Sequence, residues 1–136
     1  MTAGVLVDSN VLIDLSLPGS EQHRWAVERI RELSITRSAR INPLIYAEVA
    51  SVFESIGDLN RFPPEEEFVR EPLPWEAALP TSRAFLRYRR GGGTRTSPLP
   101  DFYIGAHAEA AGHRLLTRDV QRFRTYFPRV ELIHPG

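Results

Sequence analysis

The sequence predicts a single α/β domain in which a parallel sheet carries helices on both faces. Short apolar runs rich in β-branched residues, beginning with Val5–Val7, alternate with stretches of helical periodicity, and this alternation is typical of parallel sheets with crossover helices. Two of the apolar runs are followed by an aspartate. The chain of 136 residues suits one domain, 1–136, and contains no internal repeat or low-complexity segment.

The first third of the chain predicts two strands and two helical segments. Val5–Val7 is typical of a strand buried on both faces. A helical turn is expected over 10–15, and Ser20 suits the N-cap of an amphipathic helix over 21–33. The inward side of that helix is expected to carry Trp25, Ala26, Val27, Ile30 and Leu33. A second strand is expected over 39–42.

A second amphipathic helix is predicted from Pro43, because proline is favoured at the first helical position. Its apolar stripe recurs at helical spacing and comprises Ile45, Val49, Val52, Phe53 and Ile56. Glu48 lies about 90° from the centre of that stripe, on the flank between core and solvent. Gly57 and Asp58 are expected to end the helix, and the acidic segment 63–67 to start a short one.

Residues 72–90 predict a further helical region. Pro80 interrupts it, so that either one helix kinks there or a second helix starts. Its core candidates are Trp75, Leu79, Phe85 and Leu86. Arginines crowd its end, and a glycine-rich segment, 91–97, follows. This arrangement fits a grip on a phosphate backbone, with Tyr88 available for stacking, and equally fits arginines that only stabilise a helix C-terminus.

The last third predicts a helix that opens at 99–101, then strands over 114–117 and 130–133 separated by a short helix or turn over 120–127. One side of the opening helix carries small residues that are expected to let it lie close against the sheet. These residues are Gly105, Ala108, Ala111 and Gly112.

Three aspartates stand at places that share one edge of a parallel sheet. Asp8 and Asp119 follow apolar strands and Asp101 lies in a first helical turn, so the three are expected to converge. Considered alone, each also suits a helix cap. Unit charges about 5 Å apart repel by about 3 kcal/mol at an effective dielectric of about 20, so a converged cluster must hold protons or a cation. Oxygen ligands without thiolates favour Mg²⁺ or Mn²⁺.

The composition excludes some chemistry and leaves nucleic acid open as a partner. The chain has no cysteine, which excludes disulfides, thiolate catalysis and cysteine-ligated zinc or iron–sulfur clusters. All 17 basic residues are arginine, which suits phosphate contacts although the net charge is +0. No apolar stretch approaches membrane-spanning length and the first residues lack a secretory pattern, so we expect a cytoplasmic protein without a membrane partner.

Four acidic motifs follow one another along the chain. They are Asp8-Ser9-Asn10-Val11-Leu12-Ile13-Asp14, Tyr46-Ala47-Glu48-Val49, Leu99-Pro100-Asp101-Phe102-Tyr103-Ile104-Gly105-Ala106-His107-Ala108 and Leu116-Thr117-Arg118-Asp119. In this order they resemble the motifs of PIN-domain ribonucleases, specifically the VapC-type toxins of bacterial toxin–antitoxin pairs. The resemblance runs from Val5 to about Pro135.

The resemblance implies a three-layer α/β/α domain with a parallel sheet of four or five strands, and endonucleolytic cleavage of RNA that depends on Mg²⁺ or Mn²⁺. It implies a catalytic and metal-binding quartet made of Asp8, Glu48, Asp101 and Asp119. Asn10 and Thr117 match positions that support the quartet through hydrogen bonds. A small antitoxin protein and a second copy of the chain are the implied protein partners.

Some expectations stand outside this resemblance. From the residues alone we infer that Arg87, Arg90 and Arg95 contact RNA. Asp14 is expected to be a helix-surface or capping residue, and His107 to pack or cap within its helix. Two other functions remain open. One is a Mg²⁺-dependent phosphatase or phosphotransferase with an aspartyl nucleophile, whose common Asp-x-Asp pattern is absent because position 10 is asparagine. The other is a non-catalytic module that keeps only the PIN fold.

Overall fold

The fold is built around an all-parallel sheet of five strands in the order β3-β2-β1-β4-β5. The structure, a computed structural model, describes residues 3–55, 57–58, 62 and 67–136. The strands are β1 (Val5–Val7), β2 (Ala39–Ile41), β3 (Val69–Arg70), β4 (Arg114–Leu116) and β5 (Leu132–Ile133). The predicted parallel sheet is confirmed. Sequence analysis missed β3, because two residues are too few to show a strand periodicity.

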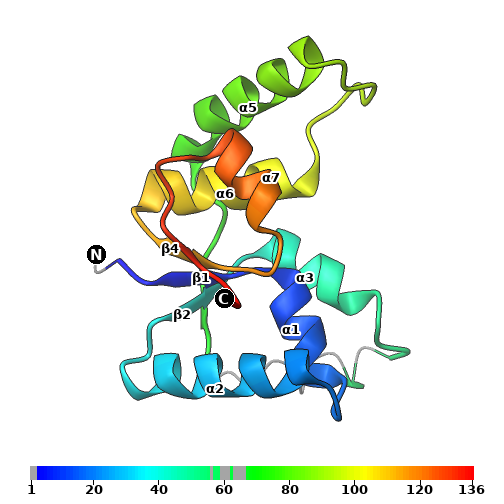
Figure 1. Ribbon diagram of the computed structural model, residues 1–136, viewed down its shortest axis with the longest axis vertical. Coiled ribbons are helices and arrows are strands. Elements are labelled where there is room, and N and C mark those ends of the chain that lie inside the picture. Colours follow the sequence, from blue (N-terminus) through cyan, green and yellow to red (C-terminus); the bar gives the residue numbers. More distant parts are fainter. Residues whose placement is uncertain (1–2, 56, 59–61, 63–66) are drawn as a thin grey trace.

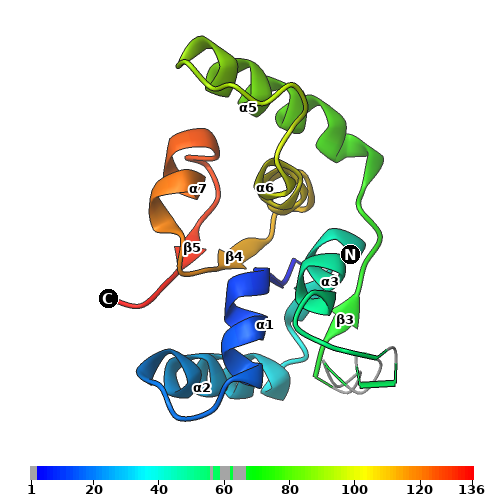
Figure 2. The same ribbon diagram turned by 90° about the vertical axis from the view of Figure 1, so that its right-hand side faces the viewer.

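Helices cover both faces of this sheet, which confirms the three-layer arrangement (Figures 1 and 2). On one side lie α1 (Ser9–Ser16) and α2 (Glu21–Ile35), and on the other lie α6 (Pro100–Ala111) and α7 (Val120–Tyr126). The remaining elements are α3 (Pro43–Ala50), the short 3₁₀ helix η1 (Trp75–Ala77) and α5 (Ala78–Arg90). Figure 2 shows α5 outside α6, away from the sheet.

The core lies between the sheet and its two helical layers. All three residues of β1 are buried, as predicted for the central strand. In α2 the predicted N-cap is confirmed, because the Ser20 hydroxyl accepts a hydrogen bond from the His23 amide at 3.0 Å. Ala26 and Ile30 of the same helix are buried. Among the described residues, no helix combines the length and apolar character needed to cross a bilayer.

The small residues of α6 were predicted to lie close against the sheet, but one of them, Gly105, contacts an aromatic ring. A Cβ on Gly105 would lie 2.3 Å from the ring of Phe127, so this glycine admits an aromatic ring rather than the sheet. Ala108 is buried, but Ala111 and Gly112 are exposed at the end of the helix. Gly112 has φ +69 at the C-cap, a left-handed conformation that glycine adopts without strain.

The predicted helix from Pro43 is shorter than expected. It ends at Ala50, because the amides of Ser51, Val52 and Phe53 donate to carbonyls three residues back and tighten the chain out of the α-helix. Val52, predicted to be in the core, is therefore 45% exposed. Two further expectations cannot be compared in full, since Ile56 and most of the acidic segment 63–67 lie outside the described residues. Gly57 and Asp58, expected to end the helix, are themselves helical.

The region over 72–90 does not form one helix that kinks at Pro80: the 3₁₀ helix η1 ends at Ala77 and α5 starts at Ala78, two residues before the proline. Pro80 is the third residue of α5, where its missing amide costs little. Three of the four predicted core residues are wrong, because Trp75 is 92%, Leu79 57% and Leu86 49% exposed. This helix lies outside α6. The residues buried in this region are the smaller ones, Ala77 at the end of η1 and Thr81 and Ala84 of α5, and not the large apolar residues that were predicted.

Candidate metal centre

Asp8 lies between β1 and α1, at the carboxyl end of the central strand. Its side chain is both a helix cap and part of a buried polar site: Oδ1 accepts from the Ser9 amide at 2.8 Å, and Oδ2 accepts from the Thr117 hydroxyl at 2.8 Å. Asp8 is only 3% exposed. The two interpretations of Asp8 from sequence are therefore compatible, because each carboxylate oxygen has its own partner.

Three carboxylates from three different elements meet at this point. Asp8, Glu48 of α3 and Asp101 of α6 each offer an oxygen, and these oxygens all lie within 4.8 Å of one another. Ser9 donates its hydroxyl to Glu48 Oε1 at 3.1 Å, which orients that side chain toward Asp8. Asp101 does not cap its helix, since the N-cap residue is Leu99 and makes no side-chain cap. The Asp101 carboxylate is thus left for the cluster.

Asp119 stands apart from these three. It is the N-cap of α7, where its carboxylate accepts from the Arg122 amide at 3.4 Å, and it is exposed. It is nevertheless close enough to Asp101 for its charge to raise the pKa of that carboxyl. The structure therefore brings three members of the predicted quartet together and leaves the fourth at the rim.

Thr117 and Asn10 lie in the predicted supporting positions. Thr117 is fully buried, and its hydroxyl accepts from the Asp119 amide at 3.0 Å and from Asn10 Nδ2 at 3.5 Å while it donates to Asp8. Asn10 Oδ1 in turn accepts from the Arg118 amide at 3.3 Å. These bonds tie the end of β4 to the start of α1 and hold the Asp8 carboxylate in one orientation.

The three carboxyls resist ionisation together. Burial raises the pKa of Asp8 to about 7, and the charges of Asp101 and Glu48 add to the rise, while the hydrogen bonds from Thr117 and Ser9 oppose it. Burial also raises the pKa of Glu48, and it raises that of Asp101 against the lowering effect of Arg122. The Arg122 guanidinium lies 3.7 Å from the Asp101 carboxylate.

This set of donors fits a hard divalent cation. All three are carboxylates, the described residues around them include no sulfur ligand, and Mg²⁺ and Mn²⁺ prefer oxygen ligands. A bound cation would also relieve the mutual repulsion that raises the three pKa values. Asp8, Glu48 and Asp101 are therefore the residues that would hold it.

Thr117→Val should weaken Mn²⁺ binding by about 10- to 100-fold, because the variant keeps the side-chain shape but leaves Asp8 Oδ2 without its donor. Thr117→Ser retains the hydroxyl and is expected to bind Mn²⁺ like the wild type. Calorimetric titration of the three proteins with Mn²⁺ measures the effect. Equal affinities for the valine and serine variants would show that this hydroxyl does not orient the ligand.

Arg118 was not identified from sequence, although it lies between two site residues. Its guanidinium makes two contacts with the Asp14 carboxylate, one of them at 3.2 Å from Nη2 to Oδ1. The expectation for Asp14 as a helix-surface or capping residue is therefore wrong: it is buried and paired. The pair fixes the 117–119 segment against α1. Its two residues are 104 positions apart in sequence, so no local pattern indicates that they interact.

The arginines predicted to contact RNA lie on and after α5. Arg87 donates to the Thr125 carbonyl at 2.9 Å and links α5 to α7. Arg90 and Arg95 are exposed at the end of the helix and in the glycine-rich segment. Tyr88, expected to be free for stacking, is half-buried against the rings of Phe85 and Phe102. The predicted RNA contacts thus remain predictions.

A second group of side chains that could bind a metal consists of Glu71, His107 and His113. Each offers one ligand atom, and these atoms all lie within 4.8 Å of one another. His113 Nδ1 accepts from the Gly4 amide at 2.7 Å, and His107 Nδ1 lies 2.9 Å from Asn42 Nδ2. Since Asn42 uses its oxygen to cap α3, its nitrogen is the donor. Both imidazoles therefore carry their proton on Nε2, which faces Glu71 Oε1 at 2.7 Å from His113 and 3.6 Å from His107.

This histidine group does not suit a metal. A cation on either Nε2 would move the proton to Nδ1, where it would face a protein N–H donor. The group instead joins edge strand β3 to α6 and to the start of β4. Burial lowers the pKa of His107, which keeps it neutral. His107 is packed, as expected, since it is only 1% exposed, but its polar partners lie on other elements and not within its own helix.

The comparisons with known proteins agree with this fold. The PIN domain family matches residues 5–127. The fold is similar to VapBC2 from Rickettsia felis, solved bound to a DNA fragment from its promoter, with TM-score 0.76, 12% identity and coverage of 97% of this chain and 98% of that chain. No curated protein sequence matches the chain significantly.

Two further solved structures show the same likeness. FitAcB from Neisseria gonorrhoeae has TM-score 0.72, 18% identity and coverage of 96% of this chain and 97% of that chain. VapBC-1 from nontypeable Haemophilus influenzae has TM-score 0.72, 18% identity and coverage of 96% of both chains. The family match spans most of the sequence, including every carboxylate described above. This chain therefore belongs to the PIN domain family.

Proposed function

We propose that this protein is a Mg²⁺- or Mn²⁺-dependent endoribonuclease that acts as the VapC-type toxin of a toxin–antitoxin pair. The observation that carries the proposal is the convergence of Asp8, Glu48 and Asp101 at the carboxyl end of β1, beside β4. In open parallel sheets this edge is where ligands bind. Membership of the PIN domain family and the fold likeness to VapBC structures support it.

Each residue of the centre has a role in this proposal. Asp8, Glu48 and Asp101 hold the cation, Ser9 and Thr117 orient two of those carboxylates, and Asp119 lies at the rim as the fourth acid. A divalent cation bound there supplies charge stabilisation for the phosphodiester and a more acidic water. Arg122 brings a positive charge to the same rim, beside Asp101, where it favours approach of a phosphate.

The proposed protein partners are a small antitoxin and a second copy of the chain. Two of the similar structures are named as VapBC assemblies, which supports an antitoxin as a proposal for this chain. Trp75, Leu79 and Leu86 are exposed on η1 and α5, and we propose that one of these partners covers them. We place the protein in the cytoplasm, where RNA and such a partner meet.

The proposal is tested by assaying the purified protein on three substrates with Mg²⁺, with Mn²⁺ and with EDTA. The substrates are a mixed-sequence RNA, single-stranded DNA of the same sequence and p-nitrophenyl phosphate. We expect internal cuts in the RNA that require the metal. Release of p-nitrophenol without RNA cleavage would favour the phosphatase. Absence of any cleavage, with the metal bound, would favour the non-catalytic module.

A further inference from the structure

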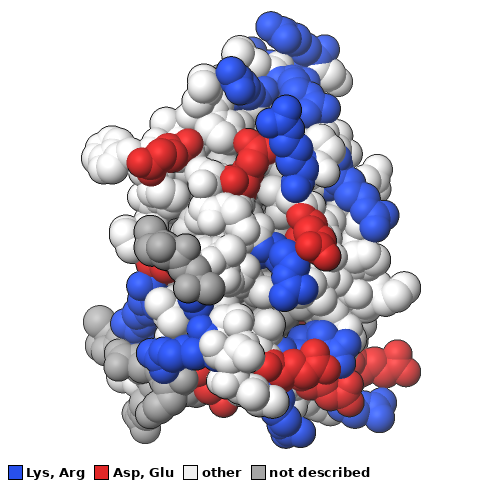
Figure 3. Space-filling model, turned by 90° about the vertical axis from the view of Figure 1, so that its left-hand side faces the viewer, with Lys and Arg blue, Asp and Glu red and all other residues white. Residues whose placement is uncertain are grey.

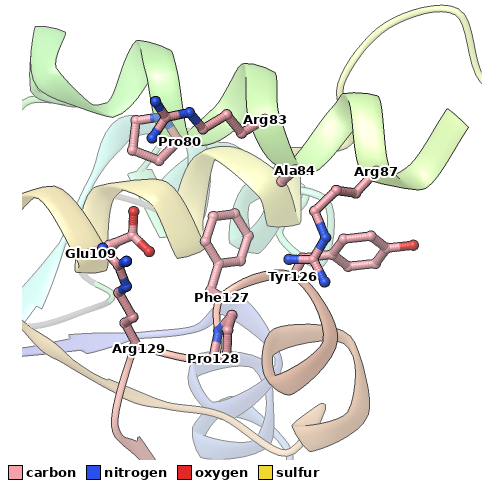
Figure 4. Close-up of a pocket in the computed structure, with 9 residues that line it drawn as sticks. All are labelled: Pro80, Arg83, Ala84, Arg87, Glu109, Tyr126, Phe127, Pro128 and Arg129. Atoms are coloured by element: carbon pink, nitrogen blue, oxygen red, sulfur yellow. The ribbon is translucent and has the colours of Figure 1, made fainter. Parts of the chain in front are cut away.

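A pocket of about 270 Å³ between α5, α7 and the loop after α7 gathers three arginines. Figure 4 shows Arg83 and Arg87 on α5 above it and Arg129 across from them. Phe127 and Pro128 line it below, and Pro80 lies beside Arg83 on α5, so apolar side chains separate the charges. Figure 3 shows basic side chains gathered at the end of the molecule where α5 lies. The net charge of the chain is +0, so this end is basic through local segregation.

The arginines of this pocket are available to a ligand. Within the described residues, neither Arg83 nor Arg129 has a carboxylate within ion-pair distance, and Glu109 is the one acid among the residues that line the pocket. Arg87 uses one nitrogen to bind the Thr125 carbonyl and lies 5.9 Å from the centre of the Tyr126 ring. Guanidinium groups recognise phosphate oxygens through paired N–H donors.

A neighbouring pocket lies nearer the metal centre. A second pocket of about 350 Å³ shares Tyr126 with the first and is lined by Tyr88, Asp119, Gln121, Arg122, Thr125 and Tyr126. Arg122 and Asp119 are the rim residues beside Asp101. We call these two neighbouring pockets together the α5–α7 groove. Glu109 of the first pocket is eight positions from Asp101 on α6, so the first pocket lies about 12 Å along that helix from this member of the metal centre.

We propose that the α5–α7 groove binds the RNA backbone on one side of the cut bond, with Arg83, Arg87 and Arg129 as a phosphate subsite. This inference rests on the proposed function for the identity of the nucleic acid. A nucleic acid fits better than an acidic peptide, because the groove leads directly from the acids that would act on a phosphodiester. Tyr126, which lines both pockets, holds the Arg87 guanidinium beside its ring.

The subsite predicts that the contribution of the arginines to RNA binding depends on the length of the RNA. An RNA that extends along the groove contacts the arginines, whereas one that ends near the cut bond does not reach them. Loss of two phosphate contacts should therefore raise KM for the longer RNA by about 10-fold, leave kcat unchanged and leave the short RNA unaffected. The slope of log binding affinity against log salt concentration should also become shallower by about one for each arginine removed.

The experiment compares the double variant Arg83→Ala, Arg129→Ala with the wild type on RNAs of about 20 and about 4 nucleotides. The control, Arg24→Ala with Arg31→Ala, removes the same charge from exposed positions of α2. Binding of the longer RNA is also measured with each pair of substitutions in an Asp8→Asn background, which does not depend on cleavage. A length-dependent loss confined to the groove variant supports the subsite.

Three results would overturn the subsite. One is equal losses for the groove and control variants, and another is a loss that is the same for both RNA lengths. The third is unchanged RNA binding together with arginine-dependent binding of a polyglutamate peptide, which would assign the groove to a protein partner. Failure of the proposed function is distinct, since the wild type would then cut neither RNA while the binding comparison still decides on the groove.

Discussion

Asp8→Asn and Asp101→Asn are each expected to lower metal-dependent RNA cleavage by about 1,000-fold or more. Each change removes a negative oxygen from the set that would hold the cation and replaces it with a neutral amide of almost the same shape. The amide oxygen can still accept the bond from the Ser9 amide that caps α1, so the fold should be kept, while the amide nitrogen replaces the oxygen that accepts from the Thr117 hydroxyl. Initial rates on a labelled RNA in saturating Mn²⁺ measure the effect.

Asp119→Asn should lower the rate of RNA cleavage less than either of these substitutions. Asp119 caps α7 at the rim and does not join the three converged oxygens. Glu76→Gln serves as the matched control, because Glu76 is an exposed acid on η1, away from the cluster. The metal-centre assignment fails if Asp8→Asn cuts RNA as fast as Glu76→Gln. Expression of the same variants in growing cells, with sequencing of RNA ends, relates cleavage to toxicity.

Without metal, the protein should become less stable as the pH rises from about 4 to above 7. The pKa of Asp8 is raised to about 7 in the folded state, against about 3.9 in an unfolded chain. The folded state therefore keeps its proton to higher pH, and the stability that this provides is lost as Asp8 ionises. A difference of about three pKa units corresponds to about 4 kcal/mol. The raised pKa values of Glu48 and Asp101 act in the same direction.

Urea unfolding in EDTA at pH 5 and pH 8 measures this loss. Asp8→Asn should be more stable than the wild type at pH 8, and this gain should shrink at pH 5. Mn²⁺ should raise the stability of the wild type at pH 8 far more than that of the variant. Asp14→Asn is the control on the same helix: it breaks the pair with Arg118 and should destabilise the protein at both pH values. A wild type equally stable at pH 5 and pH 8 would contradict the assignment.

Local sequence patterns predicted the parts of the fold that depend on near neighbours. The buried strand Val5–Val7, the Ser20 cap and the parallel direction of the strands follow from apolar runs, capping chemistry and helical connections. The exposed Trp75 was predicted wrongly for the same reason. Periodicity says that a helix has an apolar face, but not whether another element covers that face.

The sequence by itself determined that Asp8 and Asp101 stand at one edge of a parallel sheet, because strand ends and helix starts alternate there with fixed polarity. The acidic motifs also predicted that Glu48 joins them, but only the tertiary structure decided that Asp119 stays at the rim and that Arg118 pairs with Asp14. These contacts join positions tens of residues apart, so they depend on how the helices pack across the sheet. Packing of that kind is set by the whole core, and no short stretch of sequence contains it.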